Sequence, residues 1–172
     1  EAVPRSPFHV RRRERPVRGN RQLRPVPHRQ LRVRRSRVRV QAEDGRFLAY
    51  AAFSEHSQII ARVLSFNESD VIDEAFYRRQ IRASIARRSH LFSQTNAARL
   101  IHAESDGLPG LIVDRYGDVI VMQLLSAGID VQRELLAGLL TETTGCSTIY
   151  ERSDAEVREL EGLQSRTGLV AG

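Results

Sequence analysis

The chain has 172 residues, enough for one domain or two small ones with hydrophobic cores. Its single cysteine, Cys146, excludes a disulfide framework and a cysteine-based zinc cluster. No stretch approaches the roughly 18 apolar residues of a membrane span, and the N-terminus lacks the apolar core of a signal peptide. These features predict a soluble, cytoplasmic protein with no membrane partner.

The charge is unevenly distributed along the chain. All 27 basic residues are arginine, which points first to a GC-rich coding sequence. Residues 1–40 contain 14 Arg and two acidic residues, whereas residues 41–172 contain 13 Arg and 19 acidic residues. The high pI alone would suggest a nucleic-acid binder, but the part that reads as folded is mildly acidic.

Residues 1–40 are rich in Arg and Pro and hold five of the six prolines. Segments with so much charge bury too little apolar surface to offset the entropy of ordering. We therefore expect residues 1–40 to be disordered or to be read in the wrong frame. Alternating Arg and apolar residues over 31–40 leave an edge strand open as an alternative.

Residues 41–68 read as the end of a small β-barrel. Asp44-Gly45 is a turn signal, and residues 46–53 and 58–66 are predicted strands. Asp70 then has the character of an N-cap for a long helix with one apolar face, whose acidic residues fall in the first turn.

Residues 69–172 predict an α+β domain. After the first helix come strands at 98–103, 111–116 and 119–125, a helix over 129–141, a strand at 148–151 and a short helix at 155–160. The turn between the first two of these strands, residues 106–110, contains Gly and Pro. Residues 165–169 read as a loop.

No catalytic, cofactor-binding or metal-binding residue is predicted in this chain. The glycines bracket a hairpin rather than a strand-to-helix turn, and the five histidines lack ligand spacing. Glu104 and Asp106 adjoin a turn, where Asp is favoured for backbone hydrogen bonds. Cys146 has no neighbouring basic group that would activate a thiolate.

The chain from about residue 44 to 172 resembles the bacterial 23S rRNA (cytosine-C5) methyltransferases, which are class I S-adenosylmethionine-dependent enzymes. The most specific matching segment is Glu104-Ser-Asp-Gly-Leu-Pro-Gly-Leu-Ile-Val-Asp-Arg-Tyr-Gly117. Further matches are residues 45–49, 57–66, 124–128 and 149–163. The stretch 1–40 departs from the family, which opens with a motif containing Trp-Val-Phe, whereas this chain has no Trp.

The resemblance implies an N-terminal PUA domain, which is a small RNA-binding β-barrel, a central α+β domain and a C-terminal Rossmann-like methyltransferase domain. This chain matches the end of the first and most of the second. The third is expected beyond Gly172, so S-adenosylmethionine would serve the full-length enzyme but is not expected to bind this chain. The implied partner is ribosomal RNA, and no metal is expected.

Arginine forks to phosphate and tyrosine stacks on bases, so side chains of these kinds near strand ends are candidates for contact with RNA. The candidates for RNA-facing or cleft-lining residues are Arg46, Arg62, Arg115, Tyr116, Arg152 and Arg158. A purely structural role, an Asp–Arg pair holding a hairpin, weighs equally for Arg115. Two alternatives to the enzyme interpretation remain: a stand-alone RNA-binding module and a truncated product whose barrel never closes.

Overall fold

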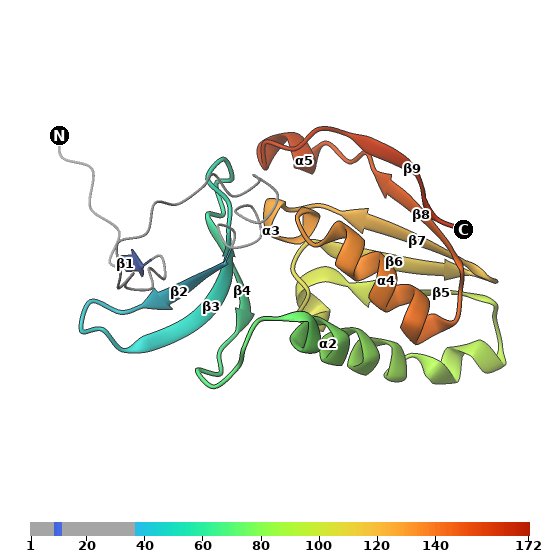
Figure 1. The fold of residues 1–172 in the computed structure, drawn as a ribbon, viewed down its shortest axis with the longest axis horizontal. Coiled ribbons are helices and arrows are strands. Elements are labelled where there is room, and N and C mark those ends of the chain that lie inside the picture. The colour runs from blue at the N-terminus through green and yellow to red at the C-terminus, as the bar shows by residue number, and fades with distance from the viewer. Residues whose placement is uncertain (1–8, 12–36) are drawn as a thin grey trace, which may run out of the picture.

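The computed structural model of the chain describes residues 9–11 and 37–172. Its strands form two separate sheets, one of four strands and one of five, joined through the segment that leads into helix α2 (Figure 1). The described part is therefore a mixed α/β structure with two sheets, as the α+β pattern of the sequence predicted.

The first sheet is antiparallel throughout, in the order β1-β2-β3-β4. Its strands are β1 (His9–Arg11), β2 (Arg37–Gln41), β3 (Phe47–Phe53) and β4 (Ala61–Ser65). Between β2 and β3, Gly45 adopts a φ of 85° and donates its N–H to the carbonyl of Ala42, which closes the predicted turn. The predicted strand at 46–53 is confirmed, and the one at 58–66 is shorter than expected.

Ordered backbone reaches into the stretch expected to be disordered or out of frame. Strand β1 and most of β2 fall within residues 1–40, and they pair with each other in the register His9 to Gln41. The alternative of an edge strand over 31–40 is confirmed as a strand at Arg37–Gln41, but β2 lies between β1 and β3 and not at the edge. The remainder of the expectation falls on residues 1–8 and 12–36, outside the described residues.

The second sheet has the order β5-β6-β7-β8-β9. Its strands are β5 (Ala97–His102), β6 (Leu111–Tyr116), β7 (Val119–Leu124), β8 (Thr148–Ser153) and β9 (Arg166–Ala171). All neighbours are antiparallel except β7 and β8. A parallel pair needs a long crossover connection, and α3 (Ala127–Asp130) with α4 (Arg133–Thr144) supplies it.

The structure corrects three details of the predicted elements. Helix α2 (Glu74–Ala86) begins after Asp73, whose carboxylate accepts the N–H of Phe76 at 3.0 Å, so Asp70 is not the N-cap. The helix expected over 129–141 is two helices. The expected loop at 165–169 lies largely in β9, whose residues pair with β8.

The remaining helical turns are short: η1 (Ser89–Ser93), η2 (Ala103–Asp106) and α5 (Val157–Leu160). None of the helices in the described part of the chain is long and apolar enough to cross a membrane.

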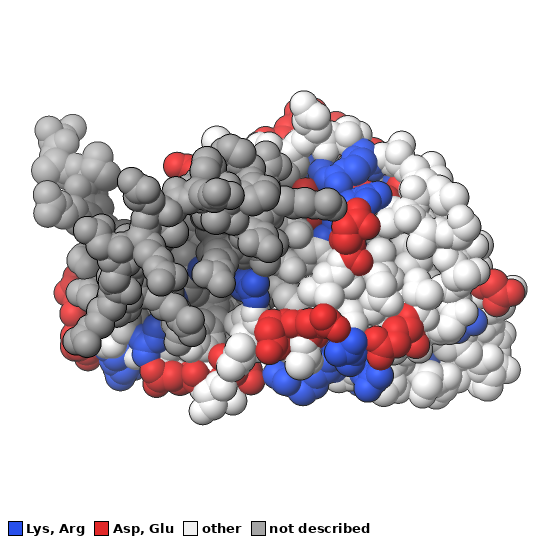
Figure 2. Space-filling view, viewed as in Figure 1, with Lys and Arg blue, Asp and Glu red and all other residues white. Residues whose placement is uncertain are grey.

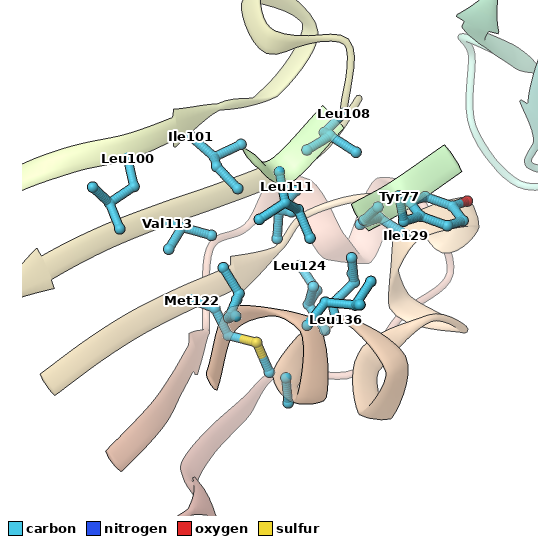
Figure 3. Packing of buried hydrophobic residues seen from close by; sticks show 14 of the residues in the cluster. Tyr77, Leu100, Ile101, Leu108, Leu111, Val113, Met122, Leu124, Ile129 and Leu136 are labelled. Atoms are coloured by element: carbon cyan, nitrogen blue, oxygen red, sulfur yellow. The ribbon is translucent and has the colours of Figure 1, made fainter. Parts of the chain in front are cut away.

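The main core lies between one face of the second sheet and the helices α2 and α4 (Figure 1). Alternate residues of β6 and β7 point into it, and Figure 3 shows Leu111, Val113 and Met122 meeting Leu136 of α4. Helix α2 contributes Phe76, Tyr77 and Ile81 to the same cluster. Among residues 37–172, no helix packs along the opposite face of this sheet.

The two sheets meet at a close seam, where glycine lets backbones approach. A Cβ on Gly128 of α3 would lie 2.3 Å from the Cβ of Ala52 in β3. A Cβ on Gly162 would lie 2.7 Å from the ring of His56, in the loop before β4. Because neither position has room for a side chain, the seam depends on these two glycines.

We predict that Gly128→Ala lowers the free energy of unfolding by about 1–3 kcal/mol, because the added methyl group overpacks the seam. Gly138→Ala in α4 is the matched control, since nothing lies within 4 Å of its added Cβ. The control should gain about 0.5–1 kcal/mol from helix propensity. Urea unfolding measures both, and equal stability of the two variants would contradict the described seam.

Candidate nucleic-acid interface

The six residues predicted to face RNA do not form one cluster. Arg46 follows the β2–β3 turn, and Arg62 lies on β4 at the seam between the sheets. Arg152 and Arg158 lie on or after β8, whereas Arg115 and Tyr116 end β6. Because β8 runs parallel to β7 and antiparallel to β6, the C-terminal end of β6 and the C-terminal end of β8 lie at opposite ends of the sheet.

Arg62 lines a groove of about 630 Å³ between β4 and the η2 turn. Its guanidinium bridges two carboxylates, donating to Glu161 at 2.9 Å and to Glu104 at 3.2 Å. The groove is otherwise mainly apolar, lined by Ile59, Val63, Leu64, Phe66 and Gly107. The prediction that Arg62 lines a cleft is thus consistent with the geometry, and the same side chain also joins the two sheets.

Glu161 is the buried partner of Arg62, with 1% of its side chain exposed. Its second oxygen accepts the N–H of Ala127, the first residue of α3, at 3.0 Å. Burial of the carboxylate would raise the pKa of Glu161, but hydrogen bonds from a hydroxyl, a backbone N–H and the guanidinium hold it below its ordinary value. Glu161 therefore remains ionised and connects β4 to α3.

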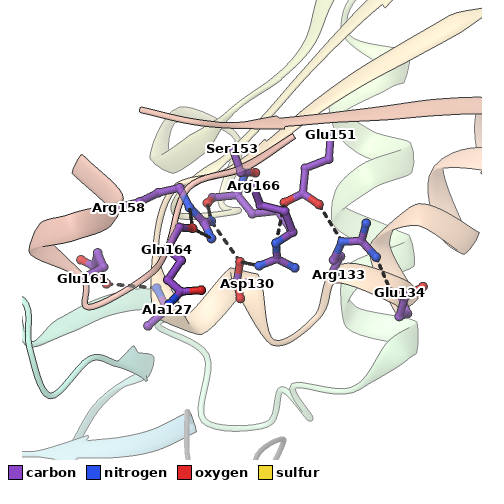
Figure 4. Close-up of polar contacts among 11 residues, drawn as sticks. Ala127, Asp130, Arg133, Glu134, Glu151, Ser153, Arg158, Glu161, Gln164 and Arg166 are labelled. Atoms are coloured by element: carbon purple, nitrogen blue, oxygen red, sulfur yellow. Dashed lines mark hydrogen bonds and ion pairs between the residues drawn. The ribbon is translucent and has the colours of Figure 1, made fainter. Parts of the chain in front are cut away.

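Of the two roles predicted for Arg158, the structure contradicts facing RNA, whereas the side chain does line a groove of about 300 Å³ together with Asp130 and Gln164. Its side chain is 1% exposed, and its guanidinium donates to the carbonyl of Gln164 at 2.7 and 2.9 Å and to Asp130 at 3.0 Å (Figure 4). A further bond goes to the carbonyl of Leu124. With its donors used inside the protein, Arg158 anchors the chain after α5 instead of facing RNA.

A second buried carboxylate, Glu151, lies beside this anchor. Arg133 donates to Glu151 at 2.6 Å, and Arg166 approaches its other oxygen at 3.5 Å (Figure 4). The buried roles of Glu151 and Glu161 were not predicted from the sequence. In β8 the available signal was the alternation along the strand, which places Glu151 on the same face as the apolar Ile149.

Arg115 and Tyr116 are neighbours in sequence but point to opposite faces of the sheet. Arg115 donates to the carbonyl of Gly117 at 2.7 Å, and its guanidinium lies 5.1 Å from the ring centre of Phe92 on the helix side. Tyr116 is 56% exposed on the face without helices. The Asp–Arg pair predicted for the hairpin is a long one, from Arg115 to Asp118 at 3.9 Å, since Asp114 pairs with Arg99. Arg115 and Tyr116 cannot form one binding site, because they point to opposite faces.

Arg46 and Arg152 are the most accessible of the predicted residues, with 70% and 67% of their side chains exposed. Each approaches one nearby carboxylate, at 3.8 Å for Asp44 and 3.6 Å for Asp154. Exposed pairs of this length contribute little energy, so both guanidiniums are available to a phosphate. On the face shown in Figure 2, arginines and acidic residues are interspersed along the edge formed by α2.

The described residues contain no group of three or more His, Cys, Asp or Glu side chains that could hold a metal ion. Cys146 is buried just before β8, and its Sγ lies 3.9 Å from the carbonyl of Thr144. Its surroundings are those of a packing residue.

Comparison with known proteins agrees with this arrangement. Residues 35–66, which include β2, β3 and β4, match the family model of the PUA-like domain. The match begins six residues before the boundary at 41 that the sequence predicted. The first sheet is thus similar to a PUA-like domain, and an α+β unit follows it.

Curated relatives carry the name ribosomal RNA large subunit methyltransferase I. The chain is 47% identical over 137 residues to the protein of Aliivibrio fischeri, a match that covers 78% of this chain and 35% of the relative. It is 46% identical over 142 residues to that of Shewanella amazonensis, which covers 81% of this chain and 36% of the relative. The chain spans about a third of the length of the curated relatives it matches.

Solved structures share the fold. One, assigned as a SAM-dependent methyltransferase from Streptococcus mutans, superposes with a TM-score of 0.63 at 16% identity, over 77% of this chain and 33% of that chain. Another, assigned as a methyltransferase and complexed with SAH, has a TM-score of 0.60 at 17% identity, over 66% of this chain and 30% of that chain. At these identities the similarity establishes the fold alone.

We predict that Arg62→Gln destabilises the protein by about 3 kcal/mol, because it leaves the buried carboxylate of Glu161 without its cationic partner. Arg46→Gln is the control and should change stability by less than about 0.5 kcal/mol, since its ion pair is exposed. Thermal and urea unfolding at neutral pH test both. An Arg62 variant as stable as the Arg46 variant would refute the role assigned to the seam.

Proposed function

We propose that this chain is the RNA-recognition part of an S-adenosylmethionine-dependent methyltransferase that modifies C5 of a cytosine in large-subunit ribosomal RNA. The observation that carries the proposal is the 47% identity over 137 residues to a ribosomal RNA large subunit methyltransferase. The PUA-like match at residues 35–66 supports an RNA-binding role for the first sheet.

In this proposal the roles of the segments follow the three-domain organisation of the family that the chain resembles. We assign residues 41–68 to the end of the PUA-like barrel and residues 69–172 to the central α+β domain. Residues 1–40 are the Arg- and Pro-rich stretch, of which residues 35–40 belong to the PUA-like match. In this proposal a separate Rossmann-like domain would hold S-adenosylmethionine and supply the reacting groups. The whole protein acts in the cytoplasm on ribosomal RNA, without a metal or a membrane.

In this proposal the solvent-accessible arginines contact the RNA phosphates. Arg46 on the first sheet and Arg152 on the second are exposed and only loosely paired, whereas Arg62 and Arg115 are held by neighbouring groups. Phosphate contacts position a protein on RNA, and bases are read by stacking and hydrogen bonds.

A second candidate is a stand-alone RNA-binding module without catalytic activity. It is favoured by Gly117, which closes the tight β6–β7 hairpin turn and does not belong to a Gly-rich strand-to-helix turn of the cofactor-binding kind. The two candidates share the RNA surface and differ only in whether a catalytic domain accompanies it.

We predict that the 172-residue chain does not bind S-adenosylmethionine, because the proposed cofactor site belongs to the other domain. Isothermal titration calorimetry with S-adenosylmethionine, and with its demethylated product as a second ligand, measures this directly. Micromolar affinity for either ligand would overturn the assignment of the cofactor site.

We predict that Arg46→Gln and Arg152→Gln each weaken binding to fragments of 23S rRNA. Each substitution should also make the plot of log affinity against log salt concentration less steep, by roughly 0.7–0.9 in slope, which corresponds to the loss of one phosphate contact. Arg78→Gln is the matched control, because Glu74 and Glu142 already engage its guanidinium at 2.8 and 3.0 Å. Equal losses in all three variants would mean that binding follows net charge and not these sites.

A further inference from the structure

The face of the second sheet opposite α2 and α4 carries a row of side chains at one level. The register places Arg99, Asp114, Val121, Tyr150 and Leu169 side by side across all five strands. Because side chains alternate along each strand, all five point away from the helix-covered core. The row therefore combines an arginine, an aromatic ring and aliphatic groups on one open surface.

The levels on either side extend this surface. Tyr116 pairs with Val119 at the next level, and Arg152 pairs with Thr167 at the level on the other side. Tyr116 is 56% exposed and Tyr150 is 41% exposed. Tyr116 lies two strands away from Tyr150 across the sheet and two residues away along the strand direction. Sheet geometry places the two rings roughly 12 Å apart. Each ring can thus receive a different flat ligand.

Arg99 offers a third flat surface. Its guanidinium makes two parallel bonds to the carboxylate of Asp114, at 2.8 and 3.0 Å. This fork fixes the plane of the guanidinium and uses its edge, so that its broad faces are left for stacking. Arg152 differs, because its closest carboxylate lies 3.6 Å away and its side chain is 67% exposed.

We propose that this open face binds an unpaired RNA strand, with bases stacked on Tyr116, Tyr150 and the Arg99 guanidinium and a phosphate at Arg152. The proposal rests on the RNA-binding function proposed above and assigns it a specific surface. Unpaired RNA is the form whose bases are exposed for stacking on Tyr and Arg, which an A-form duplex does not allow.

The composition of the face favours RNA over a docked protein. The centre of a protein interface is usually depleted of charged residues. Here the Arg99–Asp114 pair occupies two of the five positions of the row, at its β5 edge, and Arg152 with Thr167 borders the row. The face thus combines flat groups with charged and hydrogen-bonding groups, which suits a chain of bases and phosphates.

The test measures binding of a fluorescein-labelled single-stranded oligouridylate to the full chain by anisotropy. A salt concentration of about 0.3 M screens phosphate attraction to the Arg-rich residues 1–40. Replacing both tyrosines by leucine (Y116L/Y150L) keeps apolar area but removes the rings, and should weaken binding at least tenfold. The phenylalanine pair (Y116F/Y150F) keeps the rings and should bind within about twofold of the unmodified chain.

Two controls show whether binding depends on the rings of this face. Phe66→Leu removes a ring that is 77% exposed just after β4, and it should leave binding unchanged. The chain has no tryptophan, so its intrinsic emission comes from four tyrosines. Stacking on two of them should quench that emission when the oligouridylate is added, which tests the proposal in the unmodified protein even if the leucine pair fails to fold.

The outcomes distinguish the two proposals. If the chain binds RNA but the leucine pair binds equally well, or tyrosine emission is unchanged, the open face is not the site and the RNA-binding function stands. If the unmodified chain binds neither the oligouridylate nor 23S rRNA fragments, the proposed function fails and this surface with it. A leucine pair that changes self-association while RNA affinity is unchanged would make the face a protein contact and overturn the proposal.

Discussion

One buried carboxylate, that of Glu161, bonds to both sheets at their seam. Glu161 accepts hydrogen bonds from Arg62 of the first sheet and from the start of α3, which belongs to the second. Burying a charge is costly unless it is paired and fully hydrogen-bonded, so this carboxylate makes other arrangements of the sheets unfavourable. The glycines at the seam allow the approach, and the apolar groove beside Arg62 exists only because the sheets meet at this point.

Period-two alternation decides which side chains can act together on the second sheet. Arg115 lies on the helix side, over the ring of Phe92, and Tyr116 on the open side. Residues far apart in sequence, such as Arg99 and Leu169, share a surface because the register aligns them. A functional surface on a sheet is therefore defined by cross-strand levels and not by neighbours along the chain.

Much of the fold could be predicted from the sequence, because several strands and turns are specified by residues that are adjacent in the chain. The Asp-Gly turn and the strands of the β6–β7 hairpin were found in this way. The edge strand β9 was missed, because its residues 165–169 have a loop-like composition and gain their order by pairing with β8. The buried role of Arg158 was also missed, because its partners Asp130 and the carbonyls of Leu124 and Gln164 come from three separate segments.

The rigid seam also has a consequence for affinity. The first sheet presents Arg46 and the second presents Arg152, and the seam fixes the span between them. For an RNA long enough to reach both, the second contact is intramolecular and its effective concentration is set by geometry, without the entropy cost of a flexible linker. If both surfaces bind RNA as proposed, two individually weak surfaces would act as a bivalent binder, and an RNA whose shape does not match the fixed span would lose this avidity entirely.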